Sequence, residues 1–357
     1  MIVGFATSPP DRPIRLVTQQ GEESVHRRYP TIAAAAAVLA LGACVDSNSA
    51  TDAVAPPNSV SASRSQEFNS RHIFHTKDFY SPSNAARPRS NSGIYYHGGP
   101  LIVNPSVTNV VAIYWGNSGS MYANGPASGA GAGTADGSLI GYFLSNLGGS
   151  PYFGINATYY DGSNAFVINA VNYTNYWATG TDVDPPSSSP TDANMVAVIQ
   201  AGIDLMRIPY DPNTVYAIFT GPGINLGGGF GSQYCAYHTH GTVTAGGASR
   251  IALYAAMPHN QDFPSGCTAG YPSPNSDVAA NSEVNTLAHE VEETTTDELG
   301  TAWYDRRGYE NADKCAWTWG TLQTANNGGV YNMLLGGAPF LVQRNWKNAG
   351  SGGCALS

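Results

Sequence analysis

Apolar runs alternate along the chain with amphipathic stretches, and this pattern predicts a domain that contains both strands and helices. Residues 107–115, 214–220 and 250–256 are short runs rich in β-branched and aromatic residues, which is typical of buried strands. Residues 139–147 and 192–206 repeat apolar positions at helical spacing, and Asp192 stands where a helix would begin. Strands interleaved with helices predict an α/β or α+β fold, with a mixed central sheet flanked by helices.

Two further segments complete the predicted pattern. Residues 157–160 and 165–171 flank Asp161-Gly162 and are predicted to form a pair of strands. Residues 282–297 form the clearest amphipathic stretch, with Ser282 at the expected N-cap position and an apolar face that contains Leu287 and Val291. We therefore expect this segment to be the last helix of the domain.

The N-terminal part of the chain has the pattern of an export signal. Arg27 and Arg28 precede an apolar run that ends in Leu41-Gly42-Ala43-Cys44, and small residues before a cleavage point complete a signal peptide over residues 1–43. The run is shorter than the roughly 20 apolar residues that a membrane span needs. Its ending resembles a lipobox, in which Cys44 would be lipidated, although a plain secretory signal with an unmodified Cys44 and a buried Ala-rich helix are alternatives.

Residues 44–94 are polar, contain several prolines and lack periodicity, so we expect a flexible tether. Within it, Ile73-Phe74 is a short apolar piece that could dock on the domain. Residues 95–357 are then predicted to form one domain, because their length suits a single large unit.

The cysteines agree with export. Of the five cysteines, assigning Cys44 to the lipid leaves four, an even number that suggests two disulfides in an exported domain. Pairing of sequence neighbours closes the shortest loops and predicts the bonds Cys235–Cys267 and Cys315–Cys354.

Charge limits the possible partners. The chain has 16 Lys and Arg against 25 Asp and Glu, for a net charge of −9, and only three of the basic residues are lysines. No basic cluster occurs along the sequence, so nucleic acid is a poor candidate partner. We expect contact with a membrane through the lipid anchor and a peptide or a cell-wall glycan as substrate.

The strongest candidate for chemistry is His289-Glu290-Val291-Glu292-Glu293 in the last predicted helix. His289 and Glu293 are four residues apart and project from one helix face, as the two metal ligands of a His-Glu-x-x-His zinc site do. Glu290 would then act as general base on a water molecule activated by the metal. A solvated acidic helix is the alternative interpretation, because carboxylates on a helix often face water.

Other segments offer further ligands. Glu310 is the expected third ligand and Asp313 a fourth, since both precede Cys315 in a short acidic segment. His238 and His240 alternate in an extended segment and are alternative ligands. Asp297 is too far along the helix to share an ion with His289 and is expected to bond the following turn. Zinc is the expected ion, and the carboxylates leave calcium as an alternative.

Several motifs in the same order resemble the phosphate-induced, or EXORDIUM, family over residues 95–354. They are Tyr96-His97-Gly98-Gly99-Pro100-Leu101, Trp115-Gly116, Gly229-Phe230-Gly231 with Cys235 and the His238/His240 pair, Ser273-Pro274-Asn275 with Asp277, Asn311-Ala312 with Cys315, and Phe340-Leu341 ahead of Cys354. The resemblance implies an exported, cell-surface or wall-associated protein and brings no established catalytic activity. The lipobox and the long tether depart from plant members of that family and suit a microbial surface.

Three functions are therefore in competition. The first is a zincin-like metallohydrolase, most simply a peptidase, with His289, Glu290 and Glu293 in its active-site helix. The second is a non-catalytic surface protein whose zinc or calcium ion orders residues 290–313. The third is a glycan-binding module that uses exposed aromatic side chains as stacking platforms.

Overall fold

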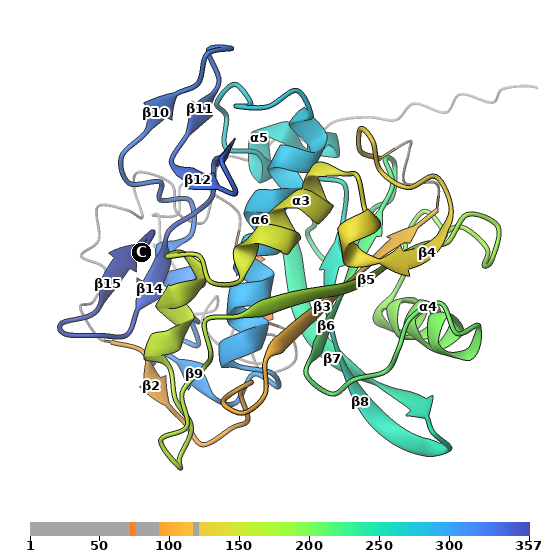
Figure 1. The fold of residues 1–357 in the computed structure, drawn as a ribbon, viewed down its shortest axis with the longest axis horizontal. Coiled ribbons are helices and arrows are strands. Elements are labelled where there is room, and N and C mark those ends of the chain that lie inside the picture. The colour runs from red at the N-terminus through yellow and green to blue at the C-terminus, as the bar shows by residue number, and fades with distance from the viewer. Residues whose placement is uncertain (1–71, 76–92, 117–120) are drawn as a thin grey trace, which may run out of the picture. The chain divides into compact units, whose positions relative to one another are not determined.

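The computed structural model describes residues 72–75, 93–116 and 121–357. Their main feature is a mixed central sheet of six strands in the order β7-β8-β6-β3-β5-β4 (Figure 1). The short β1 pairs with β7 at its outer edge. Strands β8, β6, β3 and β5 run parallel, whereas β7 and β4 pair antiparallel at the two edges. In sheet order, the strands are β1 (His72–His75), β7 (Tyr234–Ala245), β8 (Ala248–Met257), β6 (Thr214–Thr220), β3 (Thr108–Trp115), β5 (Val171–Ala178) and β4 (Gly129–Ala132).

The central strands are buried on both faces, which explains their nearly continuous apolar sequences. Every residue of β6 is buried, and in β3 only Asn109 is partly exposed. A parallel strand covered on both faces needs apolar side chains at odd and even positions alike. The three strands predicted from these runs, at residues 107–115, 214–220 and 250–256, are therefore confirmed as β3, β6 and β8.

Helices cover both faces of the sheet, as expected for the predicted fold class. Helices α3 (Leu139–Leu147) and α6 (Val278–Thr296) share one apolar core with Val110 and Ala112 of β3. Helix α4 (Asp192–Asp204) packs in a second core with Val111 and Ile113 of the same strand, whose side chains alternate between the faces. The helices predicted at 139–147 and 192–206 are confirmed, and Figure 1 shows α6 passing close to α3.

The helix that carries the predicted site is longer than expected. Helix α6 begins at Val278, and the side chain of Asp277 caps it by accepting a hydrogen bond of 2.9 Å from the backbone N–H of Ala280. The prediction that Ser282 is the N-cap was wrong, because Asp277, five residues earlier, occupies that position. Residues 280–296 of α6 are buried, so the alternative of a solvated acidic helix does not hold.

One predicted strand pair does not form. Residues 153–158 are the 3₁₀ helix η3, and only Tyr160 and Phe166 pair across the turn. Asp161 closes that turn by accepting hydrogen bonds from the backbone N–H groups of Ser163 and Ala165, so the turn is stable without long flanking strands.

Short strands and turns complete the described chain. The paired strands are β2 (Tyr95–Tyr96) with β9 (Trp303–Tyr304), β10 (Gln323–Thr324) with β11 (Val330–Tyr331), β12 (Met333–Leu335) with β13 (Ala338–Phe340), and β14 (Asn345–Lys347) with β15 (Gly353–Ala355). Single turns of helix are η2 (Gly133–Ala135), η4 (Asn260–Asp262), α5 (Pro264–Cys267) and η5 (Asp313–Cys315).

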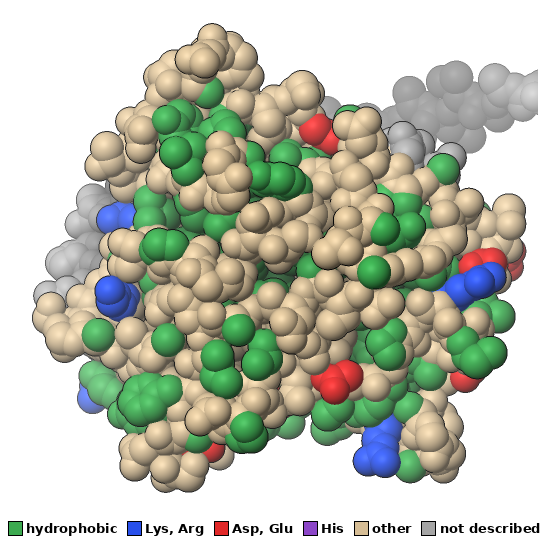
Figure 2. Space-filling view, in the orientation of Figure 1, with side chains coloured by type: hydrophobic (Ala, Val, Ile, Leu, Met, Phe, Trp, Pro, Cys, Tyr) green, Lys and Arg blue, Asp and Glu red, His purple; other side chains and the backbone are tan. Residues whose placement is uncertain are grey.

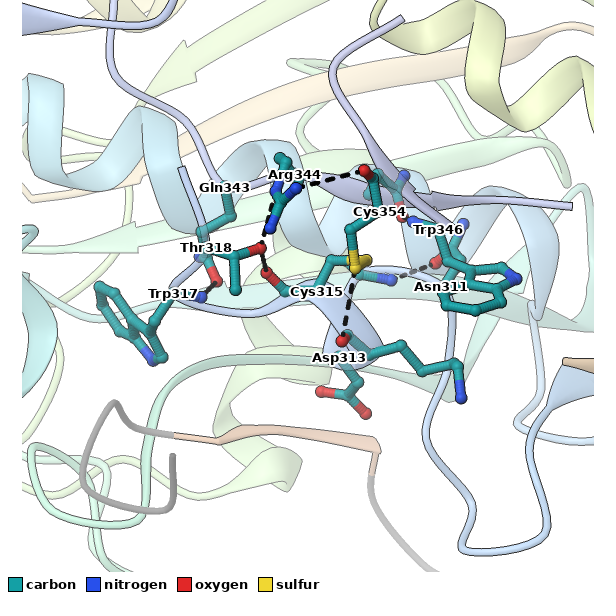
Figure 3. Close-up of a disulfide and its surroundings, with 12 residues drawn as sticks. Asn311, Asp313, Cys315, Trp317, Thr318, Gln343, Arg344, Trp346 and Cys354 are labelled. Carbon is teal, nitrogen blue, oxygen red and sulfur yellow. Dashed lines mark hydrogen bonds between the residues drawn. A yellow bond between two sulfur atoms is a disulfide. The ribbon is translucent and has the colours of Figure 1, made fainter. Parts of the chain in front are cut away.

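Both predicted disulfides are confirmed. Cys235 bonds Cys267 across 32 residues, and Cys315 bonds Cys354 across 39 residues. Figure 3 shows the second bond between η5 and the C-terminal hairpin, with Asp313 close by. The two bonds therefore anchor β7 and η5, the two segments that turn out to face helix α6.

The predicted signal peptide, Cys44 and most of the predicted tether lie outside the described residues. The exception is β1, which falls inside residues 44–94 and pairs with β7, with His72 opposite His238 in the backbone register. In the described part of the chain, no helix has both the length and the apolar character that crossing a membrane requires.

Candidate metal centre

Helix α6 positions three side chains of the predicted motif inside the protein. His289, Glu290 and Glu293 are each no more than 1% exposed. The helix packs against β7 and β8, at the β7 end of the six-stranded sheet. Because these three residues are buried, the alternative of a solvated acidic helix does not apply to them.

The first group of possible ligands consists of His289, Glu293 and Asp313. The Nε2 atom of His289 lies 3.0 Å from Glu293 Oε1 and 3.5 Å from Asp313 Oδ1. The backbone N–H of Asp313 donates a 2.8 Å hydrogen bond to the same Glu293 oxygen, which fixes that carboxylate relative to η5. The three ligand atoms lie within 4.8 Å of one another, close enough for contraction around one ion.

The second group consists of His238, Glu290 and Glu293, again with ligand atoms within 4.8 Å of one another. His238 reaches it from β7, where Ala236 on the same face packs in the core with α6. Its Nδ1 atom lies 3.2 Å from Glu290 Oε2 and 3.6 Å from Glu293 Oε2. On the other side of the ring, Nε2 lies 3.7 Å from Glu310 Oε2.

The segment that supplies Glu310 and Asp313 is held in place by its own bonds. The backbone N–H of Glu310 is 3.4 Å from Asp313 Oδ2, and Cys315 follows directly in the disulfide with Cys354. Beyond the disulfide, the backbone N–H of Trp317 donates to the side chain of Gln343 at 2.6 Å (Figure 3). The segment around Asp313 is therefore held by a contact within the segment itself and by bonds to the C-terminal part of the chain.

The electrostatics of the cluster favour a bound cation. Burial, followed by the neighbouring Asp313 carboxylate, raises the pKa of Glu293. Burial and the Glu293 carboxylate raise the pKa of Glu310 well above its usual range. Burial lowers the pKa of His289, but the Glu293 and Asp313 carboxylates outweigh it and raise that pKa to about 10. A divalent cation bound among these carboxyl groups would lower their pKa values, because its positive charge favours the ionised form.

The structure places the predicted residues in three ways. It brings His289, Glu293 and Asp313 together, sets Glu290 and Glu310 beside them, and adds His238, which was only an alternative ligand. It leaves His240 exposed and in neither group.

Asp297 bonds the following turn, as expected: its Oδ1 accepts from the backbone N–H of Ala302 at 2.7 Å and its Oδ2 from that of Trp303 at 3.2 Å. Sequence reasoning did not single out Glu283 and Glu292, two further buried carboxylates of α6.

The face drawn in Figure 2 carries little charge by comparison with this interior cluster. It mixes polar and apolar side chains and shows few acidic or basic ones. All six residues of the cluster (His238, His289, Glu290, Glu293, Glu310 and Asp313) are at most 2% exposed.

Comparison of the chain with protein-family models, with curated proteins and with solved structures finds no match.

Proposed function

We propose that this protein is an exported, metal-dependent hydrolase with a peptidase-like, zincin-like active-site helix. The observation that supports the proposal most strongly is the arrangement of His289, Glu293 and Asp313 around one point, with Glu290 next to the histidine on the same helix. One histidine nitrogen and two carboxylates form a donor set that suits zinc. The oxygen atoms would also suit calcium, which remains the alternative ion.

In this proposal the ion supplies Lewis acidity, which favours loss of a proton from a water molecule. The protein supplies the remaining steps. With one ion in the first group, Glu290 is the proton acceptor, since it is on the metal-binding face but outside that group. His238 contacts Glu290 Oε2 at 3.2 Å and holds this carboxylate in place.

A second candidate function is a non-catalytic site in which the ion only stabilises the fold. The complete burial of the cluster favours it, because a hydrolase must let its substrate reach the ion. Such a site would order residues 290–313 in a cell-surface or glycan-binding protein, in keeping with the resemblance to the EXORDIUM family.

Two substitutions separate the candidates. In the hydrolase, His289→Ala removes the ion of the first group and turnover together, whereas Glu290→Gln abolishes turnover and leaves the ion of the first group bound. In the structural alternative, neither form hydrolyses substrate and His289→Ala lowers the melting temperature. The assay is hydrolysis of a fluorophore-labelled unfolded protein by the zinc-loaded chain, with metal content measured in parallel. Absence of hydrolysis by the wild-type, zinc-loaded chain would overturn the catalytic proposal.

We also propose that the domain is lipid-anchored through Cys44 on the outer side of a membrane. The two disulfides support export, because such bonds persist in oxidising compartments. Cys44→Ser is expected to move the protein from the membrane fraction to the soluble fraction. Recovery of the variant in the membrane at wild-type levels would contradict the anchor.

A further inference from the structure

We propose that the cluster holds two divalent cations bridged by Glu293, with the second ion bound by His238, Glu290 and Glu293. This inference rests on the metal site of the proposed function and extends it. It starts from the way in which the two groups of ligands share a single residue.

The two oxygens of Glu293 face different histidines. Oε1 lies 3.0 Å from His289 Nε2, and Oε2 lies 3.6 Å from His238 Nδ1. A carboxylate that presents one oxygen to each of two ligand groups has the geometry of a bridge. Bridged pairs of ions in two-metal hydrolases stand roughly 3.5–4 Å apart, which suits two groups that share one side chain.

Each group also contains its own histidine and its own second carboxylate. Asp313 completes the group at Oε1, and Glu290 completes the group at Oε2. In the described residues, His238 and His289 do not belong to a common group, so a single ion would use one histidine and leave the other to a neighbouring site.

The far side of His238 supports its role as a ligand. While Nδ1 faces Glu290 and Glu293, Nε2 lies 3.7 Å from Glu310 Oε2. Metal-binding histidines commonly contact a carboxylate through their second nitrogen, which orients the ring and increases its basicity. Glu310, which the sequence predicted as a ligand, would here orient a ligand.

The charges of the cluster match two divalent ions. Glu290, Glu293, Glu310 and Asp313 carry four negative charges when ionised, and histidines that bind metal are neutral. Two divalent cations supply four positive charges, whereas one cation leaves two negative charges inside the protein. Burying uncompensated charge is costly, so the pair of ions is the better match.

With the second ion bound, Glu290 serves as a ligand through Oε2. The two ions would together supply Lewis acidity, and the carboxylates of the cluster would be the available proton acceptors. The two-ion and one-ion arrangements therefore differ in what Glu290→Gln does to metal content.

The test is to titrate the metal-stripped, full mature chain with zinc by calorimetry and to measure bound metal by elemental analysis. The wild type is expected to bind two zinc ions per chain. His238→Ala and His289→Ala should each bind one, and Glu290→Gln should weaken the second ion by at least tenfold. His240→Ala is the matched control on the same strand and should bind two.

Each outcome bears on a separate claim. One ion per chain, lost in His289→Ala and unchanged in His238→Ala, would overturn the two-ion site and leave the proposed hydrolase standing. Two ions without hydrolysis would refute the hydrolase and leave the two-ion site standing. A wild-type chain that binds no zinc, and no calcium in the same titration, would overturn both. If an alanine variant fails to fold, Asp313→Asn replaces His289→Ala and the wild-type stoichiometry still decides.

Discussion

Helix α6 carries two kinds of buried carboxylate, and their surroundings differ sharply. Glu283 accepts a 2.6 Å hydrogen bond from the backbone N–H of Asn260, and Glu292 accepts one of 2.6 Å from the side-chain amide of Asn345. Glu290 and Glu293 face histidine nitrogens and other carboxylates, and Glu293 also accepts a hydrogen bond from the backbone N–H of Asp313. All four are equally buried, so burial alone does not mark a metal ligand.

The difference teaches how to distinguish structural acids from metal ligands in such a helix. Glu283 and Glu292 meet hydrogen-bond donors, which stabilise a carboxyl group without any ion. Glu293 meets a histidine and an aspartate, and two acids placed together repel unless a cation or protons lie between them. We therefore expect metal at the second pair of residues and none at the first.

Removal of the metal should have the largest effect on stability, because only the second pair of carboxylates is expected to depend on it. Stripping both ions with a chelator leaves the carboxylates of the cluster to repel one another. Each ion present at a hundredfold excess over its Kd stabilises the fold by about 2.7 kcal/mol. At about 2–4 °C for each kcal/mol, two ions correspond to a fall in Tm of roughly 10–20 °C. Thermal unfolding with and without chelator measures it, and an unchanged Tm would place all four carboxylates in one structural class.

Loss of the disulfide Cys315–Cys354 should have the next largest effect, because this bond connects a segment that supplies a metal ligand to one that supports a structural carboxylate. It links η5, which supplies Asp313, to β15, whose partner β14 supplies Asn345. In the chain-entropy model, closing a loop of this length stabilises the fold by about 3–4 kcal/mol. Cys315→Ser with Cys354→Ser should lower the free energy of unfolding by that amount in metal-free protein and weaken zinc binding about tenfold. Zinc affinity equal to that of the wild type would show that the bond does not position Asp313.

The adjacent residues Glu292 and Glu293 provide the sharpest matched pair. Glu293→Gln removes a charged ligand, and we expect zinc binding to weaken by about a hundredfold or more, the upper end of what loss of a supporting residue costs. Glu292→Gln should leave zinc affinity within about twofold, since the glutamine oxygen can still accept from Asn345. Calorimetry on both variants checks this, and equal losses of affinity would remove the distinction between the two classes.

The smallest expected effect is the contribution of Glu283 to the pH dependence of stability. Burial raises the pKa of Glu283 well above its usual value of 4.5, so the folded state holds a proton that the unfolded state releases. The contribution of Glu283 to the free energy of unfolding is then fully present below about pH 4.5. It falls as pH rises toward the pKa of the folded state, by at most about 1.4 kcal/mol per pH unit. Glu283→Gln should flatten this dependence between pH 5 and 7 in urea unfolding. Identical slopes for variant and wild type would show that Glu283 is ionised in the fold.

The sequence predicted those features that depend on local spacing. His289 and Glu293 share a helix face because four residues complete about one turn, whatever the helix packs against. The buried strands β3, β6 and β8 were readable because burial on both faces requires an apolar run. The disulfides followed from the closure of the shortest loops.

The sequence could not predict features set by long-range packing. His238 joins the cluster because α6 lies on β7, and its contact with Glu290 spans 52 residues of chain. The roles of Glu283 and Glu292 could not be predicted, since their partners Asn260 and Asn345 come from distant segments. The helix start was missed because Asp277, and not Ser282, caps the helix, which adds residues 278–281.

The most direct test of the difference between the two classes of carboxylate is anomalous diffraction at the zinc edge, on crystals of the mature chain grown with zinc. The account predicts anomalous peaks beside both oxygens of Glu293, within bonding distance of His289 and His238, and none beside Glu283 or Glu292. A cluster without anomalous density, or a peak beside Glu292, would contradict it.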